Sequence, residues 1–284
     1  MSEERAEKKR CTAVILAGGS GSRMKSGVAK QFMLLDGKPL LWYSLQAVQQ
    51  SQIIDDCILV AGKGEDTADG EGTDILDYVR LEIVEKYGFT KVVSIIPGGS
   101  ERCWSVANAM AVLRDTEEPG SMSGRDGYVF IHDSARPFLT EEILRRTYEA
   151  VQQYHACVAA MPSKDTVKLA DDNAFATDTP DRSRVWIIQT PQVFDVSLIT
   201  EAYRKLSLMY GDSGSLTGME QSPITDSARG LRDSQPDQPP VTDDASVVER
   251  FTDIKVKLVE GSYQNIKITT PEDIKVAEAF ITLP

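Results

Sequence analysis

A glycine-rich turn followed by two cations is the first feature of the sequence that could perform chemistry. The sequence AGGSGSRM occupies residues 17–24, and Lys30 follows it. Glycines allow backbone N–H groups to approach a polyphosphate closely, and Arg23 and Lys30 would add positive charge to that loop. The run matches neither G-x-x-x-x-G-K-[ST] nor G-x-G-x-x-G, because Met24 stands where the third glycine of the second pattern belongs. A plain tight turn is the alternative interpretation.

The sequence HDSARP at residues 132–137 could bind a cation and an anion side by side. A carboxylate such as Asp133 can hold Mg²⁺ or a substrate hydroxyl, and the guanidinium of Arg136 can grip a phosphate with two hydrogen bonds. A simple ion pair between Asp133 and Arg136 is the alternative. His132 closes an apolar run, so we expect a structural, hydrogen-bonded histidine there.

A second glycine pair, Gly98 and Gly99, precedes Arg102 and Ser105. These glycines follow one predicted strand and open a helix. The amino terminus of that helix could bind an anion or the edge of a base. Without other evidence, the same residues are equally consistent with an ordinary turn and helix cap.

Short apolar runs alternate with helical patterns, and these elements must position the three motifs. Each motif follows a predicted strand, and in open α/β sheets ligands bind beyond the carboxyl ends of strands. The alternation predicts an α/β fold with a mostly parallel twisted sheet and helices on both faces. The predicted strands are Cys11–Leu16, Cys57–Val60, Lys91–Ile96, Tyr128–His132 and Lys255–Glu260, and the predicted helices cover 41–48, 76–83, 100–113, 140–151, 196–207 and 243–251 and resume at 270.

Two segments interrupt this pattern. Residues 164–192 are polar and β-like, which predicts a β-arm that reaches outside the body of the protein. Residues 208–240 are dominated by Gly, Pro, Ser and Asp, a composition typical of a mobile insertion without a core of its own. With no second core in evidence, residues 1–284 are predicted to form a single domain.

Composition excludes several classes of protein. The chain has 284 residues, of which 41% are hydrophobic and 26% charged, so it can bury an ordinary globular core. Its formal net charge of −12 argues against binding to nucleic acid or to an anionic membrane surface, since both require basic patches. No stretch approaches the ~18 apolar residues of a membrane span, and the charged amino terminus is no signal peptide. We therefore expect a cytoplasmic protein.

Cysteine and histidine offer no metal site. The four cysteines, Cys11, Cys57, Cys103 and Cys157, lie far apart without a CxxC pair, and the chain has only two histidines. A zinc site would need such ligands close together. Buried free thiols are the expected state.

In this order, the motifs resemble a known family. The sequences AGGSGSRM…KQF, GGSER..S, HDSARPF, DTVK, TPDRSRVW..QTPQ, TDDAS and NIKITTPED are similar to those of the 2-C-methyl-D-erythritol 4-phosphate cytidylyltransferases of the non-mevalonate isoprenoid pathway. The resemblance spans residues 11–281 except 208–240. It implies a Rossmann-like nucleotidyltransferase fold, a homodimer formed through the β-arm at about 164–192, and CTP and a polyol phosphate as substrates.

The resemblance also implies a role for each matching residue. The catalytic cations would be Arg23, Lys30 and Lys267, which contact the triphosphate and the reacting phosphate. Asp133 would face both the sugar phosphate and a divalent cation, Mg²⁺. The nucleotide would be bound by Ala17, Gly18, Gly19, Gly98, Gly99, Arg102 and Ser105, and the polyol phosphate by Asp133, Arg136, Thr166, Arg182 and Thr242, with Thr166 and Arg182 arriving from the other subunit.

The chain departs from the family at several positions. Ala29 stands where a proline often precedes the loop lysine, and Gly18 replaces the usual second alanine of that loop. Gln264 precedes Asn-Ile-Lys where some relatives carry an acid, which puts a second metal-binding carboxylate in doubt. Two alternatives remain at this point. Ribitol-5-phosphate cytidylyltransferases share the motifs and differ in the acceptor, and a non-catalytic nucleotide-binding protein would keep only the fold.

Overall fold

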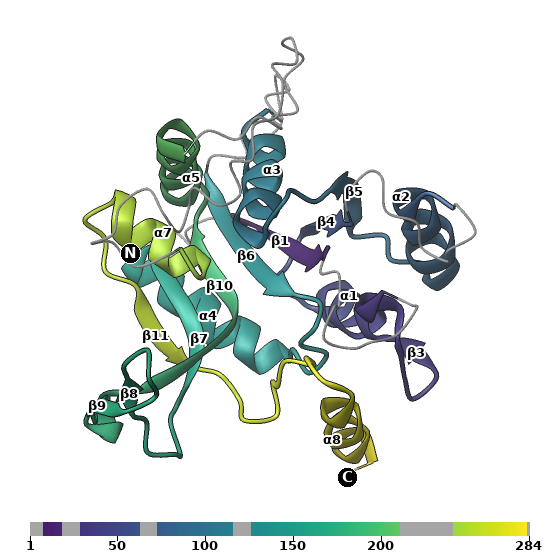
Figure 1. Ribbon diagram of the computed structural model, residues 1–284. Helices are drawn as coiled ribbons and strands as arrows, with labels where there is room; N and C mark the ends of the chain where they lie inside the picture. The colour runs from purple at the N-terminus through teal and green to yellow at the C-terminus, as the bar shows by residue number, and fades with distance from the viewer. Residues whose placement is uncertain (1–7, 19–28, 63–72, 116–125, 211–240, 283–284) are drawn as a thin grey trace, which may run out of the picture.

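A twisted seven-stranded sheet forms the centre of the structure (Figure 1). Its strand order is β11-β7-β10-β6-β1-β4-β5, and every strand except β10 runs in the same direction. The computed structural model describes residues 8–18, 29–62, 73–115, 126–210 and 241–282. The strands are β1 (Arg10–Ala17), β4 (Asp56–Ala61), β5 (Val92–Pro97), β6 (Gly127–Asp133), β7 (Ala156–Pro162), β10 (Trp186–Asp195) and β11 (Lys257–Glu260).

Both faces of the sheet are covered, which explains the unbroken apolar run of β1. Ala13 and Ile15 pack into one hydrophobic cluster, whereas Val14 and Leu16 pack into another on the opposite face. Alternate residues of a strand point to opposite faces, so a strand buried on both sides needs apolar residues at every position. The prediction of a mostly parallel sheet with helices on both faces is confirmed.

The helices divide between the two clusters. Helices α1, α2 with its π-helical continuation η3, and α4 cover one face, and α3, α5 and α7 cover the other. Helix α8 packs beside the short hairpin of β2 and β3 in a third cluster. The bounds are α1 (Leu40–Gln50), α2 (Ile75–Tyr78), η3 (Val79–Glu85), α3 (Arg102–Asp115), α4 (Glu141–Tyr154), α5 (Val196–Tyr210), α7 (Asp244–Phe251), α8 (Pro271–Thr282), β2 (Leu34–Leu35), β3 (Lys38–Pro39) and the short helical turn η2 (Lys30–Phe32).

Side-chain caps fix where two of these helices begin. Thr140 accepts a hydrogen bond from the backbone N–H of Ile143 at the start of α4, where the sequence predicts that a helix begins. Asp243 and Ser246 form a reciprocal capping box at the start of α7. This capping box fixes the position of Asp244, which follows Asp243 in the first turn of the helix.

The predicted arm is divided between a hairpin and the central sheet. Strands β8 (Leu169–Ala170) and β9 (Ala176–Asp178) form a separate two-stranded sheet, which projects beside the carboxyl end of β7 in Figure 1. Residues 186–192, however, belong to β10, which lies between β6 and β7. The predicted boundary at 192 therefore extends past the arm into the core, because the polar residues of QTPQ lie inside the sheet and form hydrogen bonds there.

The second irregular segment lies mostly outside the described residues. Its first residues, 208–210, form the last turn of α5, and residues 211–240 are not described. Among the helices that the structure describes, none combines the length and apolarity required to cross a membrane.

Candidate functional site

The segment that joins β11 to α8 brings the predicted site residues together. Ile268 donates its backbone N–H to the carbonyl of Ala135, 2.8 Å away, so this segment lies against the loop that follows β6. Lys30 Nζ donates to the carbonyl of Ile268 at 2.9 Å. Arg136 Nη1 donates to the carbonyl of Asn265 at 2.8 Å. Lys30 of η2 and Arg136 of the loop after β6 thus bind the same short stretch of backbone.

Two side chains hold this stretch against β10. Gln189 Nε2 donates to the carbonyl of Ser262 at 2.7 Å, and Gln189 Oε1 accepts from the N–H of Ser262 at 3.3 Å. Asn265, fully buried, donates from Nδ2 to the carbonyl of Thr190 and to Gln189 Oε1. A Cβ at Gly261 would lie 2.3 Å from Gln189 Oε1, so this position accepts only glycine without rearrangement.

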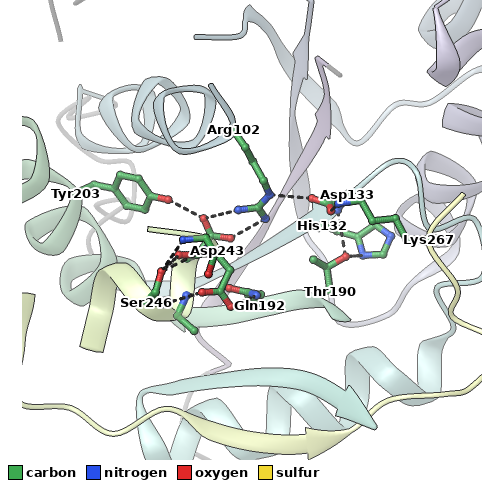
Figure 2. A network of polar contacts seen from close by, with 12 residues as sticks. Arg102, His132, Asp133, Thr190, Gln192, Tyr203, Asp243, Ser246 and Lys267 are labelled. Carbon is green, nitrogen blue, oxygen red and sulfur yellow. Dashed lines mark hydrogen bonds and ion pairs between the residues drawn. The ribbon is translucent and has the colours of Figure 1, made fainter. Parts of the chain in front are cut away.

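Lys267 extends from the same stretch to the end of β6. Its Nζ donates to Asp133 Oδ2 at 2.7 Å, and Arg102 Nε donates to Asp133 Oδ1 at 3.1 Å (Figure 2). Burial alone would raise the pKa of Asp133, but Arg102 and Lys267 more than offset it and hold that pKa well below its ordinary value. Asp133 is therefore an ionised carboxylate between two cations.

His132 has a structural role, as the sequence predicts. Thr190 Oγ1 accepts the backbone N–H of Asp133 at 3.2 Å, so its hydroxyl proton can be donated to His132 Nδ1, 2.9 Å away. His132 Nε2 is then the protonated nitrogen and donates to the carbonyl of Arg136 at 3.0 Å. Burial lowers the pKa of His132 to about 4, so the ring is neutral at pH 7. This chain of hydrogen bonds fixes the turn that carries Asp133 and Arg136.

The second glycine pair is bound to the start of α3. Gly98 donates its N–H to the carbonyl of Gly62, and Gly99 donates its N–H to Ser105 Oγ at 3.0 Å. Ser105 in turn donates its hydroxyl to the carbonyl of Glu101. A Cβ at Gly99 would lie 2.4 Å from Trp104 Cβ, so the backbone approaches the helix more closely than any other residue allows. Both the turn-and-cap interpretation and a binding role remain compatible with this geometry.

Arg102 points toward carboxylates. It binds Asp133 through Nε, and its two terminal nitrogens form a bidentate pair with Asp244, at 3.0 and 2.8 Å. Tyr203 donates its hydroxyl to the same Asp244 at 2.6 Å. Sequence reasoning assigned no role to Asp244, Tyr203 or Gln189. The only available signals were the motifs TDDAS and QTPQ, which served for resemblance and not for chemistry.

The remaining predicted site residues divide into three groups. Ala17 and Gly18 lie at the carboxyl end of β1, as expected, and Gly19 and Arg23 lie outside the described residues. Thr242 is exposed and immediately precedes the cap of α7. Thr166 and Arg182 are exposed on the arm, where Arg182 Nη1 donates to the carbonyl of Lys164. Within the part of one chain that the structure describes, no hydrogen bond joins Thr166 or Arg182 to Asp133, Arg136 or Lys267.

Comparisons with known proteins agree with one another. The family model described as 2-C-methyl-D-erythritol 4-phosphate cytidylyltransferase matches residues 11–219 and 224–283. The protein of that name from Lachnospira eligens is 43% identical over 270 residues, which is 95% of this chain and 98% of the relative. That from Caldanaerobacter subterraneus subsp. tengcongensis is 38% identical over 271 residues, which is 95% of this chain and 98% of the relative.

Solved structures show the same likeness. The crystal structure of 4-diphosphocytidyl-2C-methyl-D-erythritol synthase from Anaerococcus prevotii superposes with a TM-score of 0.68 at 31% identity, covering 97% of this chain and 99% of that one. The 2-C-methyl-D-erythritol 4-phosphate cytidylyltransferase of Francisella tularensis superposes with a TM-score of 0.65 at 25% identity, covering 95% and 99%.

Proposed function

The chain belongs to the family of 2-C-methyl-D-erythritol 4-phosphate cytidylyltransferases, and we propose that it uses its site as that membership implies. The reaction joins CTP and 2-C-methyl-D-erythritol 4-phosphate into 4-diphosphocytidyl-2-C-methyl-D-erythritol and releases diphosphate. The relatives and solved structures described above carry this name and none carries the ribitol alternative, so the methylerythritol acceptor is favoured.

One observation carries the assignment of residues. Lys30 and Arg136 bind backbone carbonyls within residues 265–268, and Lys267 of the same stretch binds the carboxylate of Asp133. These cations also stabilise the fold through their hydrogen bonds, but in a protein of formal charge −12 their proximity makes this part of the sheet edge locally positive. A site for two phosphorylated substrates needs such a gathering, because both substrates are polyanions.

The chemistry needs charge neutralisation more than proton transfer. The attacking group is a phosphate monoester, which is largely dianionic near neutral pH since its second pKa is near 6. In-line attack on the α-phosphorus of CTP then forms one P–O bond and breaks the bond to diphosphate, which leaves with its electron pair. Lys30 and Lys267, together with Arg23, would stabilise the charge that develops. The neutral His132 fits this mechanism, because no general base is required.

A divalent cation such as Mg²⁺ fits beside Asp133. Among the described residues, no group of three His, Cys, Asp or Glu side chains could hold a metal unaided. Mg²⁺ commonly binds through only one or two carboxylates and the phosphates of its substrate. A carboxylate offers about four lone-pair sites, of which Arg102 and Lys267 occupy two on Asp133. Bound there, the cation would supply additional positive charge to the triphosphate.

The nucleotide and acceptor are assigned to opposite sides of this cluster. Ala17, Gly18, Gly98 and Gly99 lie at the carboxyl ends of β1 and β5, Ser105 lies beside them in the first turn of α3, and we place CTP there. Arg136 and Thr242 would face the polyol phosphate. The buried Arg136 Nε has no hydrogen-bond partner in the described structure.

The arm supports a shared site in a homodimer. Leu169, Phe175 and Ile187 are exposed apolar residues on or beside the arm, with Phe175 at 71% exposure. A second copy of the chain would cover them, and two-fold symmetry would make the contact reciprocal. Thr166 and Arg182 would then reach the partner's acceptor pocket.

Diphosphate release tests the proposed reaction. Purified enzyme with Mg²⁺ and CTP should release diphosphate with 2-C-methyl-D-erythritol 4-phosphate and at least a hundredfold more slowly with ribitol 5-phosphate. UTP should support less than a tenth of the CTP rate, because it lacks the amino group of cytosine and leaves buried acceptors unpaired, a cost of ~1–3 kcal/mol each. Faster release with ribitol 5-phosphate would contradict the assigned acceptor, and equal rates with UTP would contradict the assigned base pocket.

A further inference from the structure

A network of four charged groups and a tyrosine extends from the site into the protein. Figure 2 shows Arg102 between Asp133 on one side and the capped start of α7 on the other, with Tyr203 approaching from α5. The hydrogen bond from Lys267 completes it at the solvent side. On the buried side of Arg102, within the residues that the structure describes, Asp244 and Tyr203 form no hydrogen bond with a group that the reaction above requires.

The guanidinium of Arg102 links the carboxylate of Asp244 to that of Asp133, so the position of one affects the position of the other. Its two terminal nitrogens are fixed by the oxygens of Asp244, and its third nitrogen, Nε, points at Asp133 Oδ1. A guanidinium is rigid and planar, so fixing its fork also fixes the direction of Nε. The orientation of Asp244 therefore determines where Arg102 can hold Asp133.

Asp244 is well built for that task. It is fully buried, and its two oxygens accept three hydrogen bonds, two from Arg102 and one from Tyr203. Its backbone is fixed by the capping box and by Gln192, which donates to Asp243 Oδ2 and accepts from the N–H of Ala245. The first turn of α7, which contains Asp244, is thereby attached to β10.

Asp244 also balances charge. Arg102 and Lys267 are two cations, and Asp133 and Asp244 are two anions, so the network is formally neutral. Burial alone would lower the pKa of Arg102, but Asp244 and Asp133 raise it well above its ordinary value. Without Asp244, both arms of the guanidinium would turn to Asp133, the remaining anion of the network, and would occupy the oxygen sites left for substrate or cation.

We propose that Asp244 and Tyr203 are positioning residues, which act through Arg102 to keep the carboxylate of Asp133 oriented and accessible for the reaction. Neither touches a substrate. Their loss should lower kcat more than it raises KM, because Asp133 is misoriented while the binding loops are intact. The kinetic part of this inference rests on the proposed function.

The gentlest test removes one hydroxyl. Tyr203→Phe deletes the bond to Asp244 and keeps the ring, and Tyr210→Phe is the matched control, because Tyr210 is also on α5 and its hydroxyl accepts from Arg250 of α7 at 3.2 Å. We expect Tyr203→Phe to lower kcat three- to tenfold, with KM for CTP and for the acceptor within twofold of wild type. Tyr210→Phe should leave kcat within twofold. Equal kcat in the two variants would overturn the proposal.

A double-mutant cycle tests the route through Arg102. Asp244→Asn should lower kcat at least tenfold, and Arg102→Gln should do the same. The double variant, which again has no net charge imbalance, should be no slower than Arg102→Gln alone, because both changes break one linkage. Losses that multiply would show that Asp244 acts independently of Arg102, contrary to the proposal. Should Asp244→Asn fail to fold, the same cycle with Tyr203→Phe and Arg102→Gln replaces it.

One readout needs no turnover. The Nε–H resonance of Arg102, assigned by its disappearance in Arg102→Lys, should shift in Tyr203→Phe and not in Tyr210→Phe. An unmoved resonance in Tyr203→Phe would overturn the proposal whatever the kinetics. A wild-type chain without cytidylyltransferase activity would contradict the proposed function, and this resonance would still decide whether Tyr203 and Asp244 hold Arg102.

Discussion

Lys30 has a structural contact in the described site, and the proposed reaction gives it a chemical role as well. It begins the short turn η2, and its ammonium group donates to the carbonyl of Ile268, next to Lys267 in the chain. The ammonium group of Lys30 therefore lies beside the segment that carries Lys267. The hydrogen bond of this part-buried charged donor contributes about 1.5 kcal/mol to folding.

Removal of this ammonium group should therefore affect turnover far more than stability. Lys30→Ala is expected to lower kcat at least tenfold while its thermal midpoint falls by less than about 4 °C. Lys38→Ala is the matched control, because Lys38 lies in the adjacent hairpin over the rings of Trp42 and Tyr87. Normal turnover in Lys30→Ala would remove this residue from the mechanism.

The cysteines should be inert in the folded protein. Cys11, Cys57 and Cys157 are buried, and burial raises the pKa of the partly exposed Cys103 to about 11. Since the thiolate is the reactive form, Cys103 should react at pH 8 roughly a hundredfold more slowly than a thiol of ordinary pKa. Ellman's reagent should detect all four thiols only after denaturation. A rapid native reaction at Cys103 would contradict its described environment.

At the scale of elements, β10 supports the segment that carries Lys267. Gln189 exchanges hydrogen bonds with Ser262 in both directions and accepts another from Asn265. Gln189→Leu keeps a similar volume and removes all of them. We expect kcat to fall at least tenfold, because Lys267 loses its fixed backbone, and the thermal midpoint to fall by several degrees.

Gln49→Leu separates the two effects of that change. Gln49 forms hydrogen bonds with Thr90 and with the backbone of Lys91, at the junction of α1 and β5. It should lower the thermal midpoint without a comparable loss of kcat. Parallel losses of kcat in both variants would mean that stability alone explains the effect at Gln189.

Periodicity predicted the elements well and their polar attachments poorly. The apolar runs of β1, β4 and β6 are visible in the sequence because each strand is buried on both faces. The polar residues of QTPQ resemble arm or loop sequence, yet Gln189, Thr190 and Gln192 are buried. Their partners lie more than 50 residues away in the chain, and no local pattern reveals such contacts.

The site residues divide in the same way. Asp133, Arg136, Lys30 and Lys267 follow strands or known motifs, and the structure brings them together. The pairing of Arg102 with Asp244 spans 142 residues, and it depends on tertiary packing, including that of α3 against α5 and of α5 against α7. Thr166 and Arg182 stay a prediction, because a single chain cannot test a site shared between subunits.

At the scale of the whole molecule, the proposed exchange of arms between subunits predicts complementation. Chains with Lys30→Ala and chains with Arg182→Ala are unfolded, mixed in equal amounts and refolded. Each homodimer has two defective sites. A heterodimer would have one site with both defects and one with neither, so random pairing should restore about a quarter of wild-type activity.

The same mixture distinguishes the alternative arrangement. If Arg182 served its own subunit, every site in every dimer would carry one defect, and mixing would restore no activity. Each variant refolded by itself provides the baseline. A wild-type sample treated in the same way gives the yield of refolding against which the quarter is measured.

The order of strands also sets when the site can exist during synthesis. Strand β10 lies between β6 and β7, and the contact of Lys267 with Asp133 joins residues 134 positions apart. A nascent chain that has emerged from the ribosome as far as α5 can pair β6, β7 and β10, but it lacks α7, β11 and Lys267. Such long-range contacts form late in folding. A nascent chain that stops before residue 267 lacks the ammonium group that binds Asp133, so we expect it to be inactive. Translation must pass residue 267 before this protein can act on its substrates.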